Sequence, residues 1–247
     1  SFRGFMDRTV YTKIDPELLS DLASFVDCSV VITGTNGKTT TSNLIADAVA
    51  ASGATVVCNR AGNNMEPGVV GALLEARSGL KRSGGKRVGV FECDELYTVR
   101  VLPKLKPTYF VLLNLFRDQL DRYGEIDITM NILEEMIRTV PKMQVIVNVD
   151  DALSAYLAMD SGNPYITYGI SKPVQKSAAN EIREGRFCKK CGAKLEYSFY
   201  HYSQLGDYKC PSCGFARPAI QYDAHDVKVG DQLSFQVEDK HLTANYK

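Results

Sequence analysis

The stretch Val30-Val-Ile-Thr-Gly-Thr-Asn-Gly-Lys-Thr-Thr40 joins an apolar run to a short polar loop with two glycines, and a helix-like pattern follows it. A strand that ends in such a loop and continues as a helix directs unpaired backbone N–H groups, and the positive end of the helix dipole, toward one point. Helix N-termini of this kind bind phosphate groups. The stretch therefore predicts a strand, a phosphate-binding loop and a helix, in that order.

Each residue type in this loop suits a separate task. Gly34 and Gly37 let the backbone approach an anion, Lys38 reaches the outer phosphates, and Thr39 places its hydroxyl on a magnesium ion. The standard P-loop has glycine where this chain has Ile32, so we interpret the loop as a shortened relative. The alternative is an ordinary glycine turn before a helix. The residues predicted to bind the nucleotide are Gly34, Thr35, Asn36, Gly37, Lys38, Thr39 and Thr40.

Composition predicts a soluble globular protein with one large domain and a smaller appendage, since 45% of the 247 residues are hydrophobic. No apolar run is long enough to cross a bilayer and the first residues lack a signal-peptide pattern, so we expect a cytoplasmic location and no transmembrane segment. The net charge is zero, but residues 171–218 carry nine Lys or Arg and four Asp or Glu. The basic charge is local, and the neutral total argues against nucleic-acid binding.

Short apolar runs alternate with helix-like stretches along the chain. Strands that alternate with helices favour parallel pairing, with helices on both faces and ligands at the carboxyl ends of the strands. We therefore predict an α/β fold with a P-loop-type, mostly parallel sheet. The expected strands are residues 54–58, 87–91, 109–113, 145–149 and 165–168, and the expected helices between them include residues 65–77, 128–140 and 152–159.

The predicted segments are four. Residues 1–27 form a lead-in, with a helix capped by Asp15 and Pro16 at its first position. Residues 28–170 form the central nucleotide-binding domain, and residues 171–218 an inserted zinc ribbon. Residues 219–247 return to the central domain as a β-hairpin, because residues 232–237 and 241–246 alternate about a polar turn.

Four cysteines fall into two pairs, Cys188-Lys-Lys-Cys191 and Cys210-Pro-Ser-Cys213, separated by 18 residues. This spacing is typical of the two knuckles of a zinc ribbon. Four thiolates leave no place for water on Zn²⁺, so the predicted zinc is structural. Redox use of the pairs is the alternative.

Five aromatic residues lie between the cysteine pairs, together with several lysines. We interpret the aromatics as the packing of the ribbon's own hairpin. The alternative is a surface for nucleic acid or a partner. The five are Tyr197, Phe199, Tyr200, Tyr202 and Tyr208.

The loop Gly34-Thr-Asn-Gly-Lys-Thr39 resembles the ATP loop of the Mur ligase superfamily, which includes the folylpolyglutamate synthetases. Gly62-Asn63 and Glu92 fall where that family keeps a phosphate-contacting Asn and a second-magnesium Glu. Asp118-Gln-Leu-Asp121 resembles its Asp-His-Leu-Asp signature, and Val147-Asn-Val-Asp-Asp151 resembles its Asn-Ala-Asp-Asp turn. These five motifs cover about residues 30–151.

The resemblance implies ATP and Mg²⁺ as cofactors and a catalytic set of Lys38, Glu92, Asn63 and Gln119. Magnesium would bind Thr39 and Glu92. By gapless counting, Glu134 falls near the modified lysine of several members, so its carboxylate is expected to replace that group and bind magnesium. A solvated position on a helix face is the alternative for Glu134.

Gln119 stands where the family has a metal-binding His, and this departure together with the inserted ribbon resembles the MurT-type subunits of lipid II isoglutaminyl synthases. The resemblance implies that ATP phosphorylates the α-carboxyl of D-glutamate in the lipid II stem peptide and that ammonia displaces the phosphate. A GatD-type glutamine amidotransferase subunit, bound as a heterodimer, would supply the ammonia. Lipid II would be met at the inner membrane face, which allows peripheral association with the cytoplasmic membrane surface.

The same resemblance implies that adenine and ribose contacts, and a third domain that closes the site, lie beyond Lys247. We therefore expect these 247 residues alone to bind ATP weakly or inertly. Two other functions remain open. One is a Mur or folylpolyglutamate-type ligase that joins an amino acid to its substrate without an amidotransferase partner, and the other is a zinc-ribbon nucleic-acid binder with an attached NTPase.

Overall fold

A computed structural model describes residues 14–60, 63–116, 125–174, 187–230 and 232–245. Its centre is a sheet with the strand order β11-β10-β9-β6-β5-β4-β1-β3-β2. Within this order, the seven strands β9, β6, β5, β4, β1, β3 and β2 pair in parallel, and β10 and β11 extend the sheet in antiparallel pairing. The bounds are β1 Cys28–Thr33, β2 Thr55–Cys58, β3 Arg87–Glu92, β4 Tyr109–Leu112, β5 Gln144–Asn148, β6 Tyr165–Gly169, β9 Tyr222–Val229, β10 Gln232–Val237 and β11 Lys240–Asn245.

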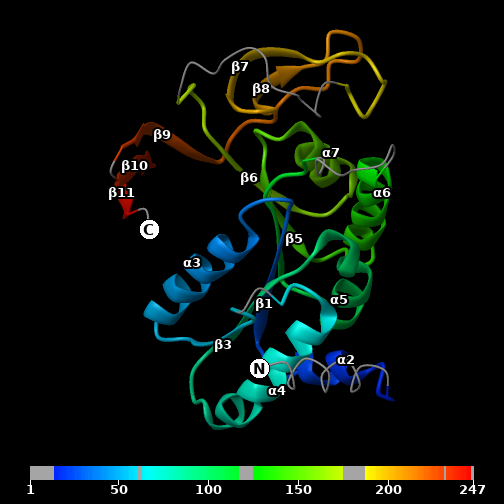
Figure 1. The fold of residues 1–247 in the computed structure, drawn as a ribbon, viewed down its shortest axis with the longest axis vertical. Helices are drawn as coiled ribbons and strands as arrows, with labels where there is room; N and C mark the ends of the chain where they lie inside the picture. Colours follow the sequence, from blue (N-terminus) through cyan, green and yellow to red (C-terminus); the bar gives the residue numbers. More distant parts are fainter. Residues whose placement is uncertain (1–13, 61–62, 117–124, 175–186, 231, 246–247) are drawn as a thin grey trace.

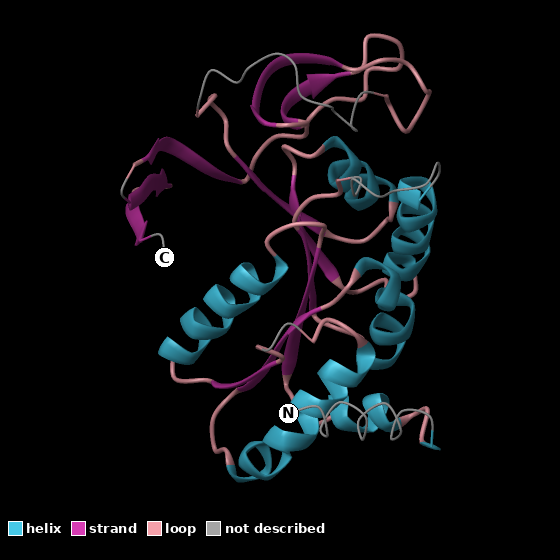
Figure 2. Ribbon diagram, viewed as in Figure 1, coloured by secondary structure: helices cyan, strands magenta, loops and turns pink. Residues whose placement is uncertain are grey.

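Helices cover both faces of the parallel part of this sheet (Figure 1, Figure 2). Along β1, Val30 and Ile32 join the apolar cluster beneath α3, while Val31 joins the larger cluster on the other face. A strand buried on both faces needs such a continuous apolar run. The helices are α2 Leu18–Ala23, α3 Lys38–Ala51, α4 Glu66–Arg82, α5 Thr98–Leu105, α6 Glu125–Arg138 and α7 Ala152–Asp160, with a 3₁₀ turn η1 at Glu95–Tyr97.

The ribbon lies between β6 and β9 in the chain. Its described part, residues 187–217, contains the antiparallel hairpin of β7 Glu196–Tyr202 and β8 Leu205–Lys209. The hairpin stands above the carboxyl end of the sheet, next to α7 (Figure 1). The α/β fold with an inserted ribbon, predicted from the sequence, is therefore confirmed.

One local prediction needs correction. The helix expected to start at Asp15 and Pro16 is α2, which begins at Leu18, because the Asp15 carboxylate accepts the Glu17 N–H in a turn that contains Pro16. Helix α5 was not among the helices listed from the sequence, and it contains Pro103, which lacks the N–H that a helix interior normally uses.

Candidate functional site

The loop after β1 has the backbone geometry that only glycine adopts easily. Gly34 has a φ of 136°, and a Cβ there would lie 2.9 Å from both the Asn114 carbonyl oxygen and the Leu113 Cβ. Gly37, the N-cap of α3, has a φ of 87° in the left-handed region. Both glycines of the predicted loop are therefore required by conformation, and Gly34 also by space.

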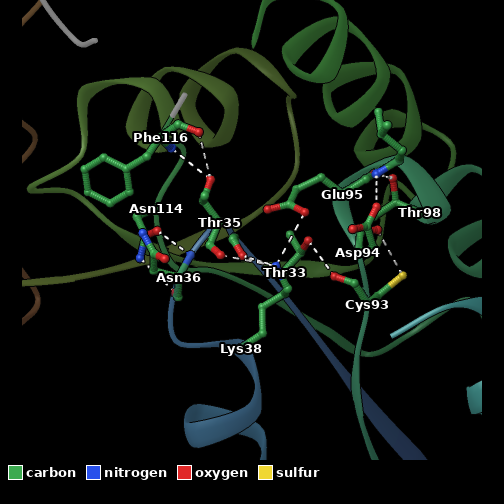
Figure 3. A network of polar contacts seen from close by, with 12 residues as sticks. Thr33, Thr35, Asn36, Lys38, Cys93, Asp94, Glu95, Thr98, Asn114 and Phe116 are labelled. Carbon is green, nitrogen blue, oxygen red and sulfur yellow. Dashed lines mark hydrogen bonds and ion pairs between the residues drawn. The ribbon is translucent and has the colours of Figure 1, made fainter. Parts of the chain in front are cut away.

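The loop is fixed to the end of β4 before any ligand arrives (Figure 3). The Thr35 N–H donates to the Asn114 carbonyl oxygen (2.8 Å) and the Asn36 N–H to the Asn114 Oδ1 (3.0 Å). Asn114 Nδ2 returns a hydrogen bond to the Asn36 carbonyl oxygen (3.1 Å). The N–H groups of Thr35 and Asn36 are thus already used to hold the loop's shape. A bound phosphate would accept hydrogen bonds from the N–H groups at the start of α3, where Thr39 and Thr40 are exposed.

Lys38 is folded back onto its own loop. Its Nζ donates to the Gly34 carbonyl oxygen (2.6 Å) and lies 3.6 Å from the Glu95 Oε2, and both side chains are largely buried, with 15% and 13% exposed. Burial raises the pKa of Glu95. Sequence reasoning missed Glu95, although an acid three residues after Glu92 was a signal for it. An incoming phosphate would compete with Glu95 for the ammonium group.

Glu92 ends β3 beside β1, in register with Ile32. Asn59 holds its backbone from both sides, accepting its N–H and donating to its carbonyl oxygen, each at 2.9 Å. The side chain is buried, and its Oε2 has no hydrogen-bond partner among the described residues. A buried carboxylate oxygen without a donor is costly unless a cation satisfies it. This arrangement fits the predicted magnesium ligand.

Asn63 is linked to the end of β3 through its backbone. Its carbonyl oxygen accepts from Asn59 Nδ2 (2.8 Å), so one side chain links residues 59, 63 and 92. Sequence reasoning missed Asn59. The predicted phosphate contact of the Asn63 side chain stays a prediction. Gly62, Gln119 and the surrounding signature, residues 118–121, lie outside the described residues.

Glu134 lies on α6, where its Oε1 accepts from Arg138 (2.8 Å) one helical turn later. Arg138 also binds the Asp160 carboxylate at the end of α7 (2.8 Å). Because α7 leads into the amino end of β6, the Arg138–Asp160 pair lies toward the amino ends of the strands, whereas the phosphate loop follows the carboxyl end of β1. The predicted role of Glu134 as a magnesium ligand stays a prediction.

The four ribbon cysteines converge. Cys188 Sγ lies 3.5 Å from Cys213 Sγ, Cys191 Sγ lies 3.5 Å from Cys210 Sγ, and all four sulfurs are within 4.8 Å of one another. Disulfide bonds would require about 2 Å. Four sulfurs around Zn²⁺, at about 2.3 Å each, would be about 3.8 Å apart. The donor set therefore fits the predicted structural zinc.

Each cysteine pair forms a tight turn closed by glycine. Gly192 and Gly214 have φ values of 77° and 76°, and their N–H groups donate to the carbonyl oxygens of Cys188 and Cys210. The backbone N–H of Cys213 faces the Cys210 sulfur and lowers the pKa of that thiol to about 6, whereas burial raises the pKa of the Cys188 thiol. The turns thus direct N–H groups at sulfur, as expected for metal-binding thiolates.

The ribbon aromatics pack mainly against one another. Tyr208 is fully buried, Tyr197 stacks on Tyr200 with ring centroids 4.4 Å apart, and Tyr208 lies against Phe215 at 5.7 Å. Phe215 also meets Tyr156 of α7 edge to face. These rings join the main core to the ribbon, which supports the packing interpretation of the aromatic residues.

The turn after β5 anchors the ribbon. The Asp150 carboxylate accepts from Arg217 Nη1 (2.8 Å) and from the Ile170 N–H (2.9 Å), and burial raises its pKa. A further ion pair joins Lys189 of the first knuckle to Asp127 of α6. Among the helices that the structure describes, none is long and apolar enough to span a bilayer.

Comparison with known proteins agrees with this geometry. The family model of the Mur ligase middle domain matches residues 32–210. The chain is 35% identical over 228 residues to the lipid II isoglutaminyl synthase (glutamine-hydrolyzing) subunit MurT of Staphylococcus aureus strain COL, and the match covers 92% of this chain and 50% of that protein. The chain thus spans about half the length of the curated relatives it matches.

Solved structures give the same fold. A pseudomurein peptide ligase type C from Methanothermus fervidus superposes with a TM-score of 0.67 at 25% identity, covering 88% of this chain and 42% of that chain. A MurF ligase from Thermotoga maritima in complex with ADP superposes with a TM-score of 0.51 at 17% identity, covering 92% and 43%. At 17% identity, the second likeness concerns the fold alone.

Proposed function

Because the chain belongs to the Mur ligase family, we propose that it is the ATP-binding part of a MurT-type subunit that amidates lipid II. The observation that carries this proposal is the pairing of β1, which leads through the glycine loop to Lys38 at the start of α3, with β3, whose last residue Glu92 keeps a carboxylate oxygen without a partner in the described part of the chain. The similarity to a glutamine-hydrolysing MurT subunit over 92% of the chain supports the acceptor and the amide donor.

In the proposed reaction, the α-carboxylate of D-glutamate in the lipid II stem peptide attacks the γ-phosphorus of ATP. A carboxylate–phosphorus bond forms and the bond to the β-phosphate oxygen breaks, giving an acyl phosphate and ADP. Ammonia then attacks the acyl carbon and phosphate leaves, which yields D-isoglutamine. Both steps need charge neutralisation and in-line positioning more than a covalent group on the protein.

The residues of this chain suit the first step. Lys38 would leave Glu95 and bind the outer phosphates, and the N–H groups of α3 would bind the phosphate oxygens. Asn63 would hold the terminal phosphate and Gln119 would arrange metal-bound water. Magnesium, held by Thr39 and Glu92 and in our proposal also by Glu134, would neutralise phosphate charge. Zinc in the ribbon would serve structure only.

Ammonia would come from a glutaminase subunit of the GatD type in a heterodimer, and lipid II would be met at the cytoplasmic face of the membrane. We propose that the chain has the four segments predicted from its sequence. Residues 1–27 are a lead-in, residues 28–170 are the nucleotide-binding domain, residues 171–218 are the ribbon, and residues 219–247 return to the central sheet.

The test uses the full-length protein purified with its glutaminase partner. Adding lipid II, Mg·ATP and glutamine is expected to give ATP hydrolysis and an equal amount of D-isoglutamine-containing lipid II, measured by mass spectrometry. Ammonium chloride should replace glutamine. Hydrolysis that responds to a free amino acid, and not to glutamine or ammonium, would contradict the amidation and favour an amino-acid ligase.

A further inference from the structure

A buried glutamine connects the ribbon to the central domain. Gln204 follows Ser203 in the turn between β7 and β8 and has no exposed surface. Its Nε2 donates to the Leu115 carbonyl oxygen (2.7 Å) and to the Asp151 Oδ1 (2.8 Å). Ser203 has a φ of 50°, a left-handed conformation that is unfavourable outside glycine. The turn thus holds a strained backbone where it directs this amide inward.

The acceptor of that amide is itself held by several donors. Asp151 is fully buried, and its Oδ2 accepts from the Leu115 N–H (2.9 Å) and from the Ser154 hydroxyl (2.6 Å) and N–H (3.2 Å). Leu115 is therefore bound through its N–H by Asp151 and through its carbonyl oxygen by Gln204. A buried carboxylate depends on such donors, so each is expected to matter.

The other side of residues 114–116 holds the phosphate loop. Thr35 is bound by the Asn114 carbonyl oxygen, and its hydroxyl bonds to the backbone of Phe116, accepting from the N–H at 2.9 Å (Figure 3). The Phe116 ring meets Tyr202, next to the hairpin turn, edge to face. Residues 114–116 thus form a short segment with the phosphate loop on one side and Gln204 with Asp151 on the other.

We propose that Gln204 is a positioning residue for the phosphate loop, acting through Leu115 and Asp151. It touches no substrate. The zinc ribbon then belongs to the nucleotide site as a support. The inference rests on the proposed function only in so far as the loop at residues 34–38 binds phosphate.

Gln204→Met tests this role in the full-length, zinc-loaded protein, because methionine has a similar volume and no amide. Two measurements are made. Hydrogen–deuterium exchange follows the amides of residues 33–38 and 114–116 without ligand, and calorimetry follows Mg·ADP binding. Ser198→Ala is the matched control, since it removes an exposed hydrogen bond to Asp207 on the same hairpin. Zinc content and melting temperature confirm that each variant is folded.

Gln204→Met is expected to raise the exchange rate at residues 33–38 and to weaken the binding of Mg·ADP about tenfold, with zinc content unchanged. The Mg·ADP affinity of Ser198→Ala should stay within about twofold of the wild-type value. If Gln204→Met does not fold, Gln204→Asn keeps the amide on a shorter arm and should show the same changes. A folded, zinc-loaded variant with wild-type exchange and affinity would overturn the proposal. If the wild type binds no Mg·ADP, the proposed function fails, and the exchange data alone decide the role of Gln204.

Discussion

The molecule contains two kinds of turn that we propose present polar groups to an ion, and they are built in different ways. The phosphate loop joins a buried strand to a helix, and Asn114 holds it from the neighbouring strand. The ribbon knuckles are turns between short strands, with four sulfurs about 3.5–4.8 Å apart as their shared centre. The first is held by the neighbouring strand, and the second brings together four cysteines that could hold a metal ion.

The glycines show this difference most clearly. A Cβ at Gly34 would meet backbone and side-chain atoms at 2.9 Å, whereas a Cβ at Gly192 or Gly214 would meet nothing within 4 Å among the described residues. Close neighbours restrict the backbone at Gly34, whereas the described neighbours leave room for a side chain at Gly192 and Gly214, whose turns are closed by hydrogen bonds to the carbonyl oxygens of Cys188 and Cys210. We therefore expect the phosphate loop to keep its geometry without a ligand and the knuckles to depend on one.

Zinc removal should have the largest effect and separate the two regions. Structural zinc contributes an apparent ~10–16 kcal/mol in small zinc domains, so chelation is expected to release the ribbon before the sheet. Hydrogen exchange should increase first in residues 187–217, while residues 28–33 and 42–51 stay protected. Unchanged exchange in residues 187–217 after chelation would show that the ribbon does not depend on metal, and an equal and simultaneous increase in both regions would show that they are not separable.

Gly34→Ala tests the enforced loop. The positive φ costs about 1–3 kcal/mol for a residue with a side chain, and the overpacking against Asn114 and Leu113 costs about 1–3 kcal/mol more. We expect urea denaturation to show a loss of about 2–6 kcal/mol in the free energy of unfolding, the sum of these two costs.

Gly79→Ala is the matched control, because Gly79 lies on the exposed side of α4, where an added Cβ would meet nothing within 4 Å in the described part of the chain. Alanine is the better helix former, so this variant should be neutral or slightly more stable. A Gly34→Ala protein as stable as Gly79→Ala would mean that the phosphate loop is not held by its neighbours.

Loss of the contact between Asp27 and Arg87, at the amino ends of β1 and β3, is expected to have the smallest effect. Asp27 accepts from the side chain and the N–H of Arg87, which lower its pKa from 3.8 to about 2. A lowered pKa stabilises the fold above about pH 4, and this contribution is lost as the pH falls toward 2. In Arg87→Met the Asp27 pKa, followed by NMR, should rise toward but stay below 3.8, because the backbone N–H remains. An unchanged Asp27 pKa would contradict the assignment.

Much of the site could be predicted because its residues are adjacent in sequence. The glycines and Lys38 of the phosphate loop and the two cysteine pairs carry their chemistry in local spacing, and the structure brings each set together. The strand and helix order followed in the same way from apolar periodicity.

The residues that were missed act across the fold. Asn59 and Gln204 are ordinary polar residues in sequence, and only the packing of strands and hairpin places them against Glu92 and Asp151. Glu95 had a sequence signal in its spacing from Glu92, but its contact with Lys38 also depends on the fold. No local pattern marks a glutamine that becomes fully buried. The predicted role of Glu134 likewise came from counting alone, and its contact with Arg138 was visible only in the fold.

Calorimetric titration of Mg·ATP into the full-length protein and into Lys38→Met tests the central claim most directly. Lys142→Met is the control, since Lys142 is exposed in the turn that leads into the amino end of β5. We predict Mg²⁺-dependent binding by the wild type and by Lys142→Met, and at least about tenfold weaker binding by Lys38→Met. Equal affinity of folded Lys38→Met and wild type would contradict the assignment of residues 34–38 as the phosphate site.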